Sequence, residues 1–285
     1  PPTINLEAEA GTIMIFDGRL LHGTGVNKTD KRRFVATMSN VKAWMRTQEN
    51  WSLSAAPDVI ENASPIGYTE NLASNYFGYN GIRVSGNGKV IAVGDSKWDV
   101  DGIVDNPTGQ VKIYKISDDT WQEIHNGIQG DIDSAYFGSS FDLSNDGSII
   151  AIGAPSDHNN YGYVSIYQNT DNKWTQIGEK INGKLGTSIG DGFGCRVTLS
   201  DDGSVVAIGN RRNSEVRLYK NENNSWTQIG SEIDVGTEQH DFAESISLSS
   251  DGSMIAIGNA MAGKNTIDGE VKVYKNENNS WVQIG

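Results

Sequence analysis

One histidine and one arginine, eleven residues apart near the start of the sequence, carry side chains that could do chemistry together. They bracket the segment His22-Gly-Thr-Gly-Val-Asn-Lys-Thr-Asp-Lys-Arg-Arg33. A neutral imidazole binds first-row transition metals, and an iron(II) centre held by two histidines and one carboxylate keeps positions open for a cosubstrate and oxygen. A guanidinium pairs with a carboxylate through two parallel hydrogen bonds. The pair therefore suggests a metal ligand beside an anchor for an acidic cosubstrate.

Two predicted strands flank this segment and would position the two side chains. Residues 12–16 (Thr-Ile-Met-Ile-Phe) and 34–38 (Phe-Val-Ala-Thr-Met) have the apolar and β-branched composition of strands. In a jelly-roll oxygenase the last histidine ligand lies on a late strand, and the arginine on the neighbouring strand points into the same barrel. The segment fits that arrangement.

The same stretch resembles the C-terminal half of the phytanoyl-CoA dioxygenase family. The family pattern His-Gly-x-Gly-x-Asn-x-Thr-x-x-x-Arg is matched at each fixed position, by His22, Gly23, Gly25, Asn27, Thr29 and Arg33. The resemblance implies that His22 is the distal iron(II) ligand and that Arg33 anchors 2-oxoglutarate. It also implies that Asn27 and Thr29 shape the turn. The spacing selects Arg33, and strand alternation then sends Arg32 to the opposite face.

The sequence departs from that family in one respect. The family's two other iron ligands form a His-x-Asp pair upstream of the distal histidine, and this sequence contains no such pair. The remaining histidines, His125, His158 and His240, lie among the repeats described below. Because one histidine binds iron(II) weakly, we expect this chain alone to be inactive. The start at Pro1, without an initiator methionine, suggests a fragment of a longer parent that would hydroxylate a small organic or lipid substrate.

Four copies of one pattern fill residues 72–285, at intervals of 52 to 55 residues. Each copy opens with Phe-Gly or a variant, which are Phe77-Gly78, Phe137-Gly138, Phe193-Gly194 and Phe242-Ala243. A turn pair follows, at Asn87-Gly88, Asp146-Gly147, Asp202-Gly203 and Asp251-Gly252. Each copy ends with a tyrosine and a tryptophan seven residues later, which are Tyr114/Trp121, Tyr167/Trp174, Tyr219/Trp226 and Tyr274/Trp281. Repetition at this period indicates a modular architecture.

The repeated segments have the composition of short strands. Apolar residues alternate with polar ones in 111–114 and 271–274, and Asp-Gly between apolar runs predicts a tight hairpin. Runs such as Ile-Ala-Ile-Gly are apolar on both faces, as expected for a strand between neighbouring sheets. Four short strands in some 50 residues match one blade of a β-propeller. A β-solenoid and an open sandwich are the alternatives.

The repeats resemble the FG-GAP family, whose propellers occur in integrin α-chains and bacterial surface proteins. The Phe-Gly opening is present in three copies, and the Gly-Ala-Pro element is complete once, at residues 153–155. That family often carries a calcium loop of alternating carboxylates. The corresponding stretches here, 143–148 and 199–204, are too short and too poor in carboxylates for six oxygen ligands, so no calcium is predicted.

Charge is distributed unevenly along the 285 residues. The net charge is −13, with +2 in residues 1–51 and −15 in the remainder, which suggests two modules. We expect the C-terminal portion of a dioxygenase jelly roll (residues 1–51), a linker (52–71) and propeller repeats (72–285). The acidic balance argues against nucleic acid as a partner. The absence of eighteen consecutive apolar residues excludes a membrane-spanning helix.

The predicted fold class is therefore all-β, a partial jelly roll followed by at least four four-stranded propeller blades. The first functional hypothesis is an iron(II)/2-oxoglutarate dioxygenase with an appended propeller that binds substrate or a surface. The ligand of the propeller is unknown and could be a protein or a glycan. The alternative is a non-catalytic propeller for binding or adhesion, with a residual jelly-roll segment. A propeller hydrolase lacks support, because no nucleophile elbow is present and no histidine recurs at a fixed place in the repeat.

Overall fold

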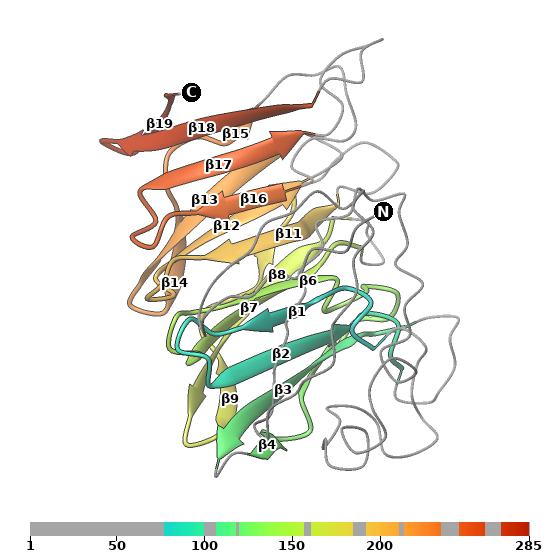
Figure 1. The fold of residues 1–285 in the computed structure, drawn as a ribbon. Helices are drawn as coiled ribbons and strands as arrows, with labels where there is room; N and C mark the ends of the chain where they lie inside the picture. The colour runs from blue at the N-terminus through green and yellow to red at the C-terminus, as the bar shows by residue number, and fades with distance from the viewer. Residues whose placement is uncertain are drawn as a thin grey trace, which may run out of the picture. The chain divides into compact units, whose positions relative to one another are not determined.

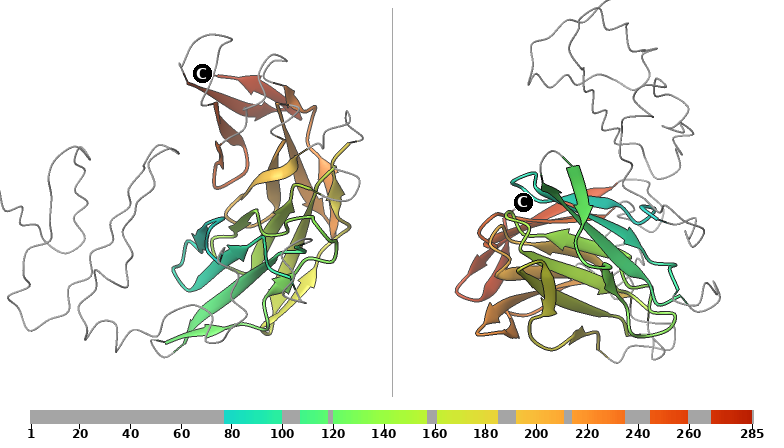
Figure 2. Two further views of the ribbon diagram at one scale, coloured as in Figure 1. Left: turned by 90° about the vertical axis from the view of Figure 1, so that its right-hand side faces the viewer. Right: turned by 90° about the horizontal axis from the view of Figure 1, so that it is seen from below.

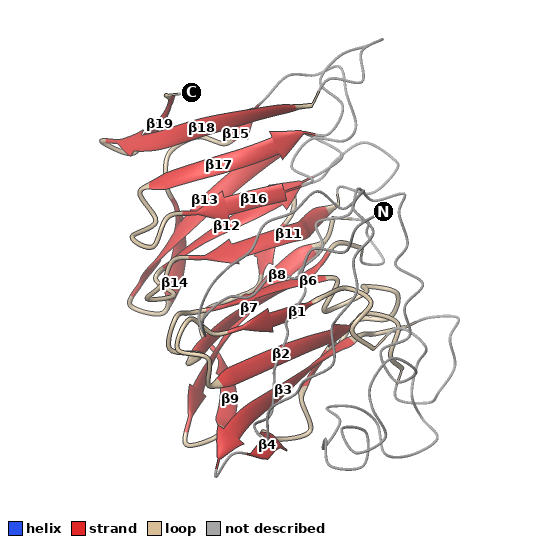
Figure 3. Cartoon of the chain, in the orientation of Figure 1, coloured by secondary structure: helices blue, strands red, loops and turns tan. Residues whose placement is uncertain are grey.

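The computed structural model describes residues 77–99, 107–117, 120–156, 161–184, 192–210, 214–234, 245–259 and 269–284. The chain divides into two compact units, residues 1–63 and 64–285, and all of the described residues belong to the second. Every regular element in them is a β-strand (Figure 3). The predicted jelly-roll segment (1–51) and linker (52–71) lie outside the described residues, so those boundaries stay predictions.

The strands form four antiparallel sheets, one for each sequence repeat (Figure 1). Blade 1 contains β1 (Ile82–Val84), β2 (Val90–Asp95), β3 (Gln110–Ser117), β4 (Thr120–Glu123) and β5 (Ile128–Gln129). Blade 2 contains β6 (Ser140–Leu143), β7 (Ile149–Ala154), β8 (Tyr163–Thr170), β9 (Lys173–Gln176) and β10 (Ile181–Asn182). Blade 3 contains β11 (Phe193–Leu199), β12 (Val205–Asn210), β13 (Glu215–Glu222), β14 (Ser225–Gln228) and β15 (Ile233–Asp234). Blade 4 contains β16 (Ser245–Leu248), β17 (Met254–Asn259), β18 (Glu270–Glu277) and β19 (Ser280–Gln283).

Each blade is a meander in which consecutive strands pair, for example β11-β12-β13-β14 in blade 3. The two-residue strands β5, β10 and β15 pair with the third strand of their own blade. The predicted Asp-Gly turns connect the first two strands. Gly88, Gly147, Gly203 and Gly252 all have φ between 68° and 73°, a left-handed conformation that glycine adopts without steric cost.

The core lies between neighbouring blades. One cluster joins Val205 and Val216 of blade 3 to Ile255 and Ile257 of blade 4, and equivalent clusters join blades 1 to 2 and 2 to 3. All six residues of β12 are buried, because each face of this strand packs against a different neighbouring sheet. The apolar Ile-Ala-Ile-Gly runs are therefore inner strands, as predicted.

Successive blades also meet along their first strands (Figures 1 and 2). The hydroxyl of Ser140 in β6 donates a hydrogen bond to the Gly194 carbonyl in β11 over 2.7 Å. The glycines of the three Phe-Gly openings, Gly78, Gly138 and Gly194, all have φ between 77° and 87°. Four meanders that pack face against face, with adjacent first strands, are blades of a β-propeller, and they confirm the predicted fold class for this part of the chain.

Candidate functional site

The four residues of the predicted iron and 2-oxoglutarate site, His22, Asn27, Thr29 and Arg33, lie outside the described residues. Their roles therefore stay predictions. Among the described residues, no group of three or more His, Cys, Asp or Glu side chains is placed to hold a metal ion. No helix there is long and apolar enough to cross a membrane. Polar groups that could serve a function are found instead at repeated positions of the blades.

The hairpin between the first two strands of each blade is closed by a side chain. In blade 3 the Asp202 carboxylate accepts hydrogen bonds from the Ser200 hydroxyl (2.7 Å) and the Ser204 N–H (2.9 Å). Asp146 and Asp251 make the same pair of contacts in blades 2 and 4, and the amide oxygen of Asn87 replaces the carboxylate in blade 1. A short side chain that accepts from nearby donors stabilises such a turn.

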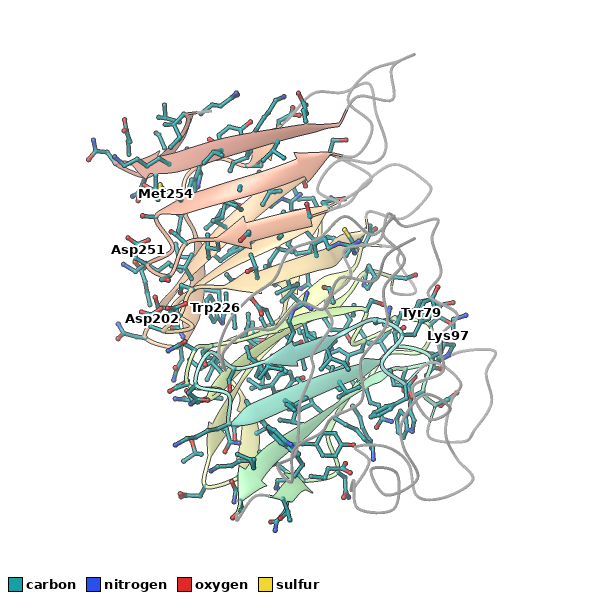
Figure 4. The ribbon with its side chains drawn as sticks, in the orientation of Figure 1. Tyr79, Lys97, Asp202, Trp226, Asp251 and Met254 are labelled. Atoms are coloured by element: carbon teal, nitrogen blue, oxygen red, sulfur yellow. The ribbon has the colours of Figure 1, made fainter. Side chains whose placement is uncertain are left out.

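Backbone hydrogen bonds connect these hairpins from blade to blade. Asn87 N–H donates to the Asn145 carbonyl, Asn145 N–H to the Asp201 carbonyl and Asp201 N–H to the Ser250 carbonyl, over 2.7–2.9 Å. We call this series the hairpin ladder. Asp202 and Asp251 lie at this end of the strands, and Tyr79 and Lys97 lie at the opposite end (Figure 4).

The hairpin carboxylates are held in the ionised form. Partial burial alone would raise the pKa of Asp202, but the hydrogen bonds from Ser204 and Ser200 outweigh it and lower the pKa. Asp146 behaves in the same way. Hydrogen bonds from Ser249 and Ser253 lower the pKa of Asp251 to about 2. These carboxylates stabilise turns, and their lowered pKa makes them poor proton acceptors.

A second polar series runs across the first strands of blades 1 to 3. The Asp142 carboxylate in β6 lies 3.8 Å from the Arg83 guanidinium in β1. On its other side it accepts hydrogen bonds from the Thr198 hydroxyl (3.0 Å) and the Leu199 N–H (2.9 Å) in β11. Arg83, Asp142 and Thr198 each pair with the alanine of the next strand, so they occupy the same register position. We call them the first-strand polar series.

Sequence reasoning missed this series, although a signal was present. The residue two positions before the hairpin serine is polar in every copy, namely Arg83, Asp142, Thr198 and Ser247. Burial raises the pKa of Asp142, and hydrogen bonds from Leu199 and Thr198 oppose that effect. Both carboxylate oxygens are occupied by neighbours within the propeller. The half-exposed Arg83 guanidinium is the part of the series that a ligand could reach.

Ion pairs join consecutive blades through their short strands. The Lys180 ammonium lies 2.6 Å from the Asp131 carboxylate and 4.4 Å from the centroid of the Tyr163 ring. At the next interface the Lys184 ammonium lies 3.2 Å from the Glu232 carboxylate. The acidic residue belongs to the earlier blade in the first pair and to the later blade in the second. The two pairs therefore have opposite polarity.

Tryptophans of the fourth strands contact the preceding blade. The indole N–H groups of Trp226 and Trp281 donate to the carbonyls of Ile177 and Ile229 over 3.0 Å. The next residue, Gly178 or Gly230, has a positive φ and leaves no room for a Cβ beside the tryptophan. At blade 1 this glycine is replaced by His125, with φ 55°, and the buried indole N–H of Trp174 has no partner.

One ion pair is buried between blades 2 and 3. Arg217 is 1% exposed, pairs with Glu215 and lies over the Phe193 ring at 4.9 Å from the centroid. The Asn210 amide donates to the same Glu215 carboxylate over 3.1 Å. Lys112, Ser165 and Lys272 occupy the equivalent position of the other blades. Since the guanidinium is enclosed by residues of the interface, it fills the core and is closed to a ligand.

A groove of about 250 Å³ lies between blades 2 and 3, lined by 178–181 and 224–226, and the Trp226 indole N–H beside it is already bonded to Ile177. The serine hydroxyls that lie at hydrogen-bond distance from a carboxylate, such as Ser200 beside Asp202, belong to the hairpin turns. These polar groups order turns and interfaces between blades.

Comparison with protein families finds one match. The model of the phytanoyl-CoA dioxygenase family matches residues 1–35, which include His22 and Arg33. No curated protein shows significant sequence similarity to the chain.

Solved structures similar to the chain include three from different organisms. The periplasmic gluconolactonase PpgL of Pseudomonas aeruginosa has 15% identity and a TM-score of 0.48, over 72% of this chain and 55% of its own. A functionally unknown protein from Desulfotomaculum acetoxidans has 13% identity and a TM-score of 0.49, over 72% and 54%. Hsv2 of Kluyveromyces lactis has 15% identity and a TM-score of 0.42, over 66% and 46%. The chain spans about half the length of these structures.

Proposed function

We propose that the chain joins the C-terminal part of an iron(II)/2-oxoglutarate dioxygenase domain to a propeller that serves as its binding module. The observation that carries this proposal is the complete His22-to-Arg33 motif within the stretch matched by the phytanoyl-CoA dioxygenase model. His22 would bind the iron, and Arg33 would pair with the cosubstrate carboxylate as a planar donor. Bound iron(II) and 2-oxoglutarate together supply oxygen activation for the hydroxylation of a small organic or lipid substrate.

We assign the propeller to binding because the carboxylates at its repeated positions already accept hydrogen bonds from other groups of the propeller. The carboxylates of Asp142, Asp146, Asp202 and Asp251 are each hydrogen-bonded within the blades. We propose further that the blades are of the FG-GAP type. This is supported by the three Phe-Gly openings, whose glycines share one left-handed conformation. A protein or a glycan is the expected ligand of such a module.

The second candidate function is a non-catalytic propeller that carries a residual jelly-roll segment. It is favoured by the carboxylates of the described blades, which are hydrogen-bonded in turns and between strands. The two functions differ in one observable property. The dioxygenase requires a longer parent with a His-x-Asp pair upstream of His22, and the binding protein does not.

The experiment compares two neighbouring arginines in the parent that this proposal requires. Arg33→Ala is expected to raise the KM for 2-oxoglutarate by about tenfold or more, because a charge-assisted pair with the cosubstrate carboxylate is lost. Arg32→Ala serves as the matched control and should leave this KM unchanged, since strand alternation is expected to turn its side chain to the other face. Equal effects of the two substitutions would contradict the assignment.

A further inference from the structure

Asparagine followed by glycine is a pair that can react within the chain, and the described blades contain several such pairs. Attack of the glycine nitrogen on the side-chain amide carbon of the asparagine closes a five-membered ring, and glycine has no Cβ to hinder that approach. The surrounding structure decides whether the two atoms can meet. The pairs are Asn80-Gly81, Asn87-Gly88, Asn126-Gly127 and Asn182-Gly183.

Hydrogen bonds hold most of the attacking nitrogens in place. The glycine N–H donates to a backbone carbonyl over 3.0 Å in Gly81, 2.8 Å in Gly88 and 2.9 Å in Gly183. A nitrogen held in this way must give up its hydrogen bond before it can attack. The Gly127 N–H makes no such bond within the described blades.

The asparagine side chains show the same contrast. The Asn87 amide accepts from the Lys89 N–H and donates to the Asp146 carbonyl, both over 2.9 Å. The Asn80 amide oxygen accepts from a serine hydroxyl over 2.6 Å. Asn126 is exposed and forms no hydrogen bond with the described residues, so its amide carbon can turn towards the neighbouring nitrogen.

We propose that Asn126 is a site of spontaneous deamidation and that the fold protects the other three Asn-Gly pairs. A bond forms between the Gly127 nitrogen and the side-chain carbonyl carbon of Asn126. The bond from that carbon to the amide nitrogen breaks, and ammonia leaves with the proton of the Gly127 nitrogen. Water then opens the cyclic imide at either carbonyl and leaves an aspartate or an isoaspartate. One water is consumed and one ammonia released, without oxidation or reduction.

The modified position adjoins the interface between blades 1 and 2. Ile128 is 7% exposed and belongs to the core cluster that joins these blades. It begins β5, which pairs with β3. In an isoaspartate the main chain runs through the side-chain carbon, so the backbone becomes one carbon longer directly before β5. The reaction therefore adds a negative charge and a longer backbone beside this interface.

Peptide mass spectrometry of the folded chain after prolonged incubation tests the proposal, because exchange of an amide for a carboxyl changes the mass of the peptide. Asn126 is expected to react about tenfold faster than Asn87, since breaking one hydrogen bond before the reaction costs on the order of a factor of ten. The rate should rise in alkaline buffer, because the attacking nitrogen must lose its proton. Asn126→Gln is the matched variant and should stop the reaction, since its longer side chain would have to close a larger ring.

Incubation in urea separates the effect of the fold from that of the sequence. All four pairs are expected to react at similar rates there, because none is held by the structure. An Asn126 that reacts no faster than Asn87 in the folded chain would overturn the proposal. A preference for Asn126 that persists in urea would assign it to the flanking residues and overturn the role of the fold. Unchanged modification of the same peptide in Asn126→Gln would place the reaction at another residue, with the same consequence.

Discussion

Asp142 illustrates how single residues hold the blades together. Its carboxylate accepts hydrogen bonds from Leu143 of its own strand and from Thr198 and Leu199 of the next blade, and it faces Arg83 of the preceding blade. One partly buried side chain therefore connects three blades. Because unmade hydrogen bonds in such a place are costly, the acceptor atoms of Asp142 matter more than its charge.

Two substitutions of Asp142 distinguish the contribution of its acceptor atoms from that of its charge. Asp142→Ala is expected to lower the free energy of unfolding by about 1–3 kcal/mol, because two donors of β11 lose their acceptor. Asp142→Asn retains an acceptor oxygen and should stay within about 1 kcal/mol of the wild type at neutral pH. Burial raises the pKa of Asp142, so the wild type should gain stability relative to the Asn variant as pH falls through the raised pKa towards 3.8. Urea denaturation across that range provides the measurement, and equal losses for Ala and Asn would contradict this account.

The lowered pKa values of the hairpin carboxylates predict that the free energy of unfolding changes with pH in the opposite direction. Their pKa values are lowered in the folded chain, so they contribute stability above the ordinary value of 3.8 and lose it as pH falls through the folded pKa, about 2 for Asp251. Replacing Asp146, Asp202 and Asp251 by Asn retains the turn acceptor, as Asn87 shows in blade 1. The triple variant should therefore unfold with a flatter pH dependence between about pH 4 and 2. A slope identical to that of the wild type would refute the role assigned to these groups.

At the scale of elements, the repeat sequence predicts each blade well. The Asp-Gly pairs lie at the hairpins, and the Ile-Ala-Ile-Gly runs are buried inner strands, because both features depend on local turn chemistry and on period-two burial. Contacts between blades could not be predicted in the same way. Lys184 and Glu232 are 48 residues apart at non-equivalent positions of the repeat, so periodicity assigns them to a face without identifying the partner.

The ion pair between Lys184 and Glu232 can be tested by exchanging its charges. Lys184→Glu places two carboxylates together and should cost up to about 1 kcal/mol, the usual range for an exposed pair. The exchange Lys184→Glu with Glu232→Lys should restore the wild-type free energy of unfolding to within a few tenths of a kcal/mol. Both values come from urea denaturation at low salt. A double variant as unstable as the single one would show that the pair does not join the blades.

When the repeats are aligned, His125 departs from the glycine that occupies its position in the next two blades. It adopts φ 55° where Gly178 and Gly230 stand in the next blades. A non-glycine residue in this conformation costs about 1 kcal/mol or more, so His125→Gly should stabilise the chain by that amount. The matched Gly178→Ala should destabilise it, because the added Cβ would meet Trp226 at 2.8 Å. Loss of stability in His125→Gly would mean that the imidazole makes a stabilising contact of its own.

At the scale of the whole molecule, the dioxygenase segment and the propeller are assigned different functions. The described part of residues 77–284 supplies the blades and the interfaces between them, whereas the proposed chemistry depends on His22 and Arg33. The motif could be recognised from the sequence because all its fixed positions lie within twelve consecutive residues, His22 to Arg33. Its ligand set could not be completed, because the other ligands of that family come from a different part of the barrel.

The chain alone should reflect that incompleteness. We expect no submicromolar binding of iron(II), with or without 2-oxoglutarate, since one histidine supplies a single ligand where the oxygenase centre needs three. A fluorescence titration under anaerobic conditions measures this directly. Submicromolar affinity that is lost in His22→Ala would mean that the chain contains a complete site.

The most direct measurement is iron-dependent release of CO₂ from 2-oxoglutarate by the parent that carries the upstream His-x-Asp pair. We predict turnover that is abolished by His22→Ala and retained in Asp142→Asn, which changes only the propeller. Turnover that survives His22→Ala, or a parent without any 2-oxoglutarate turnover, would contradict the assignment of this chain to an oxygenase with an appended binding propeller.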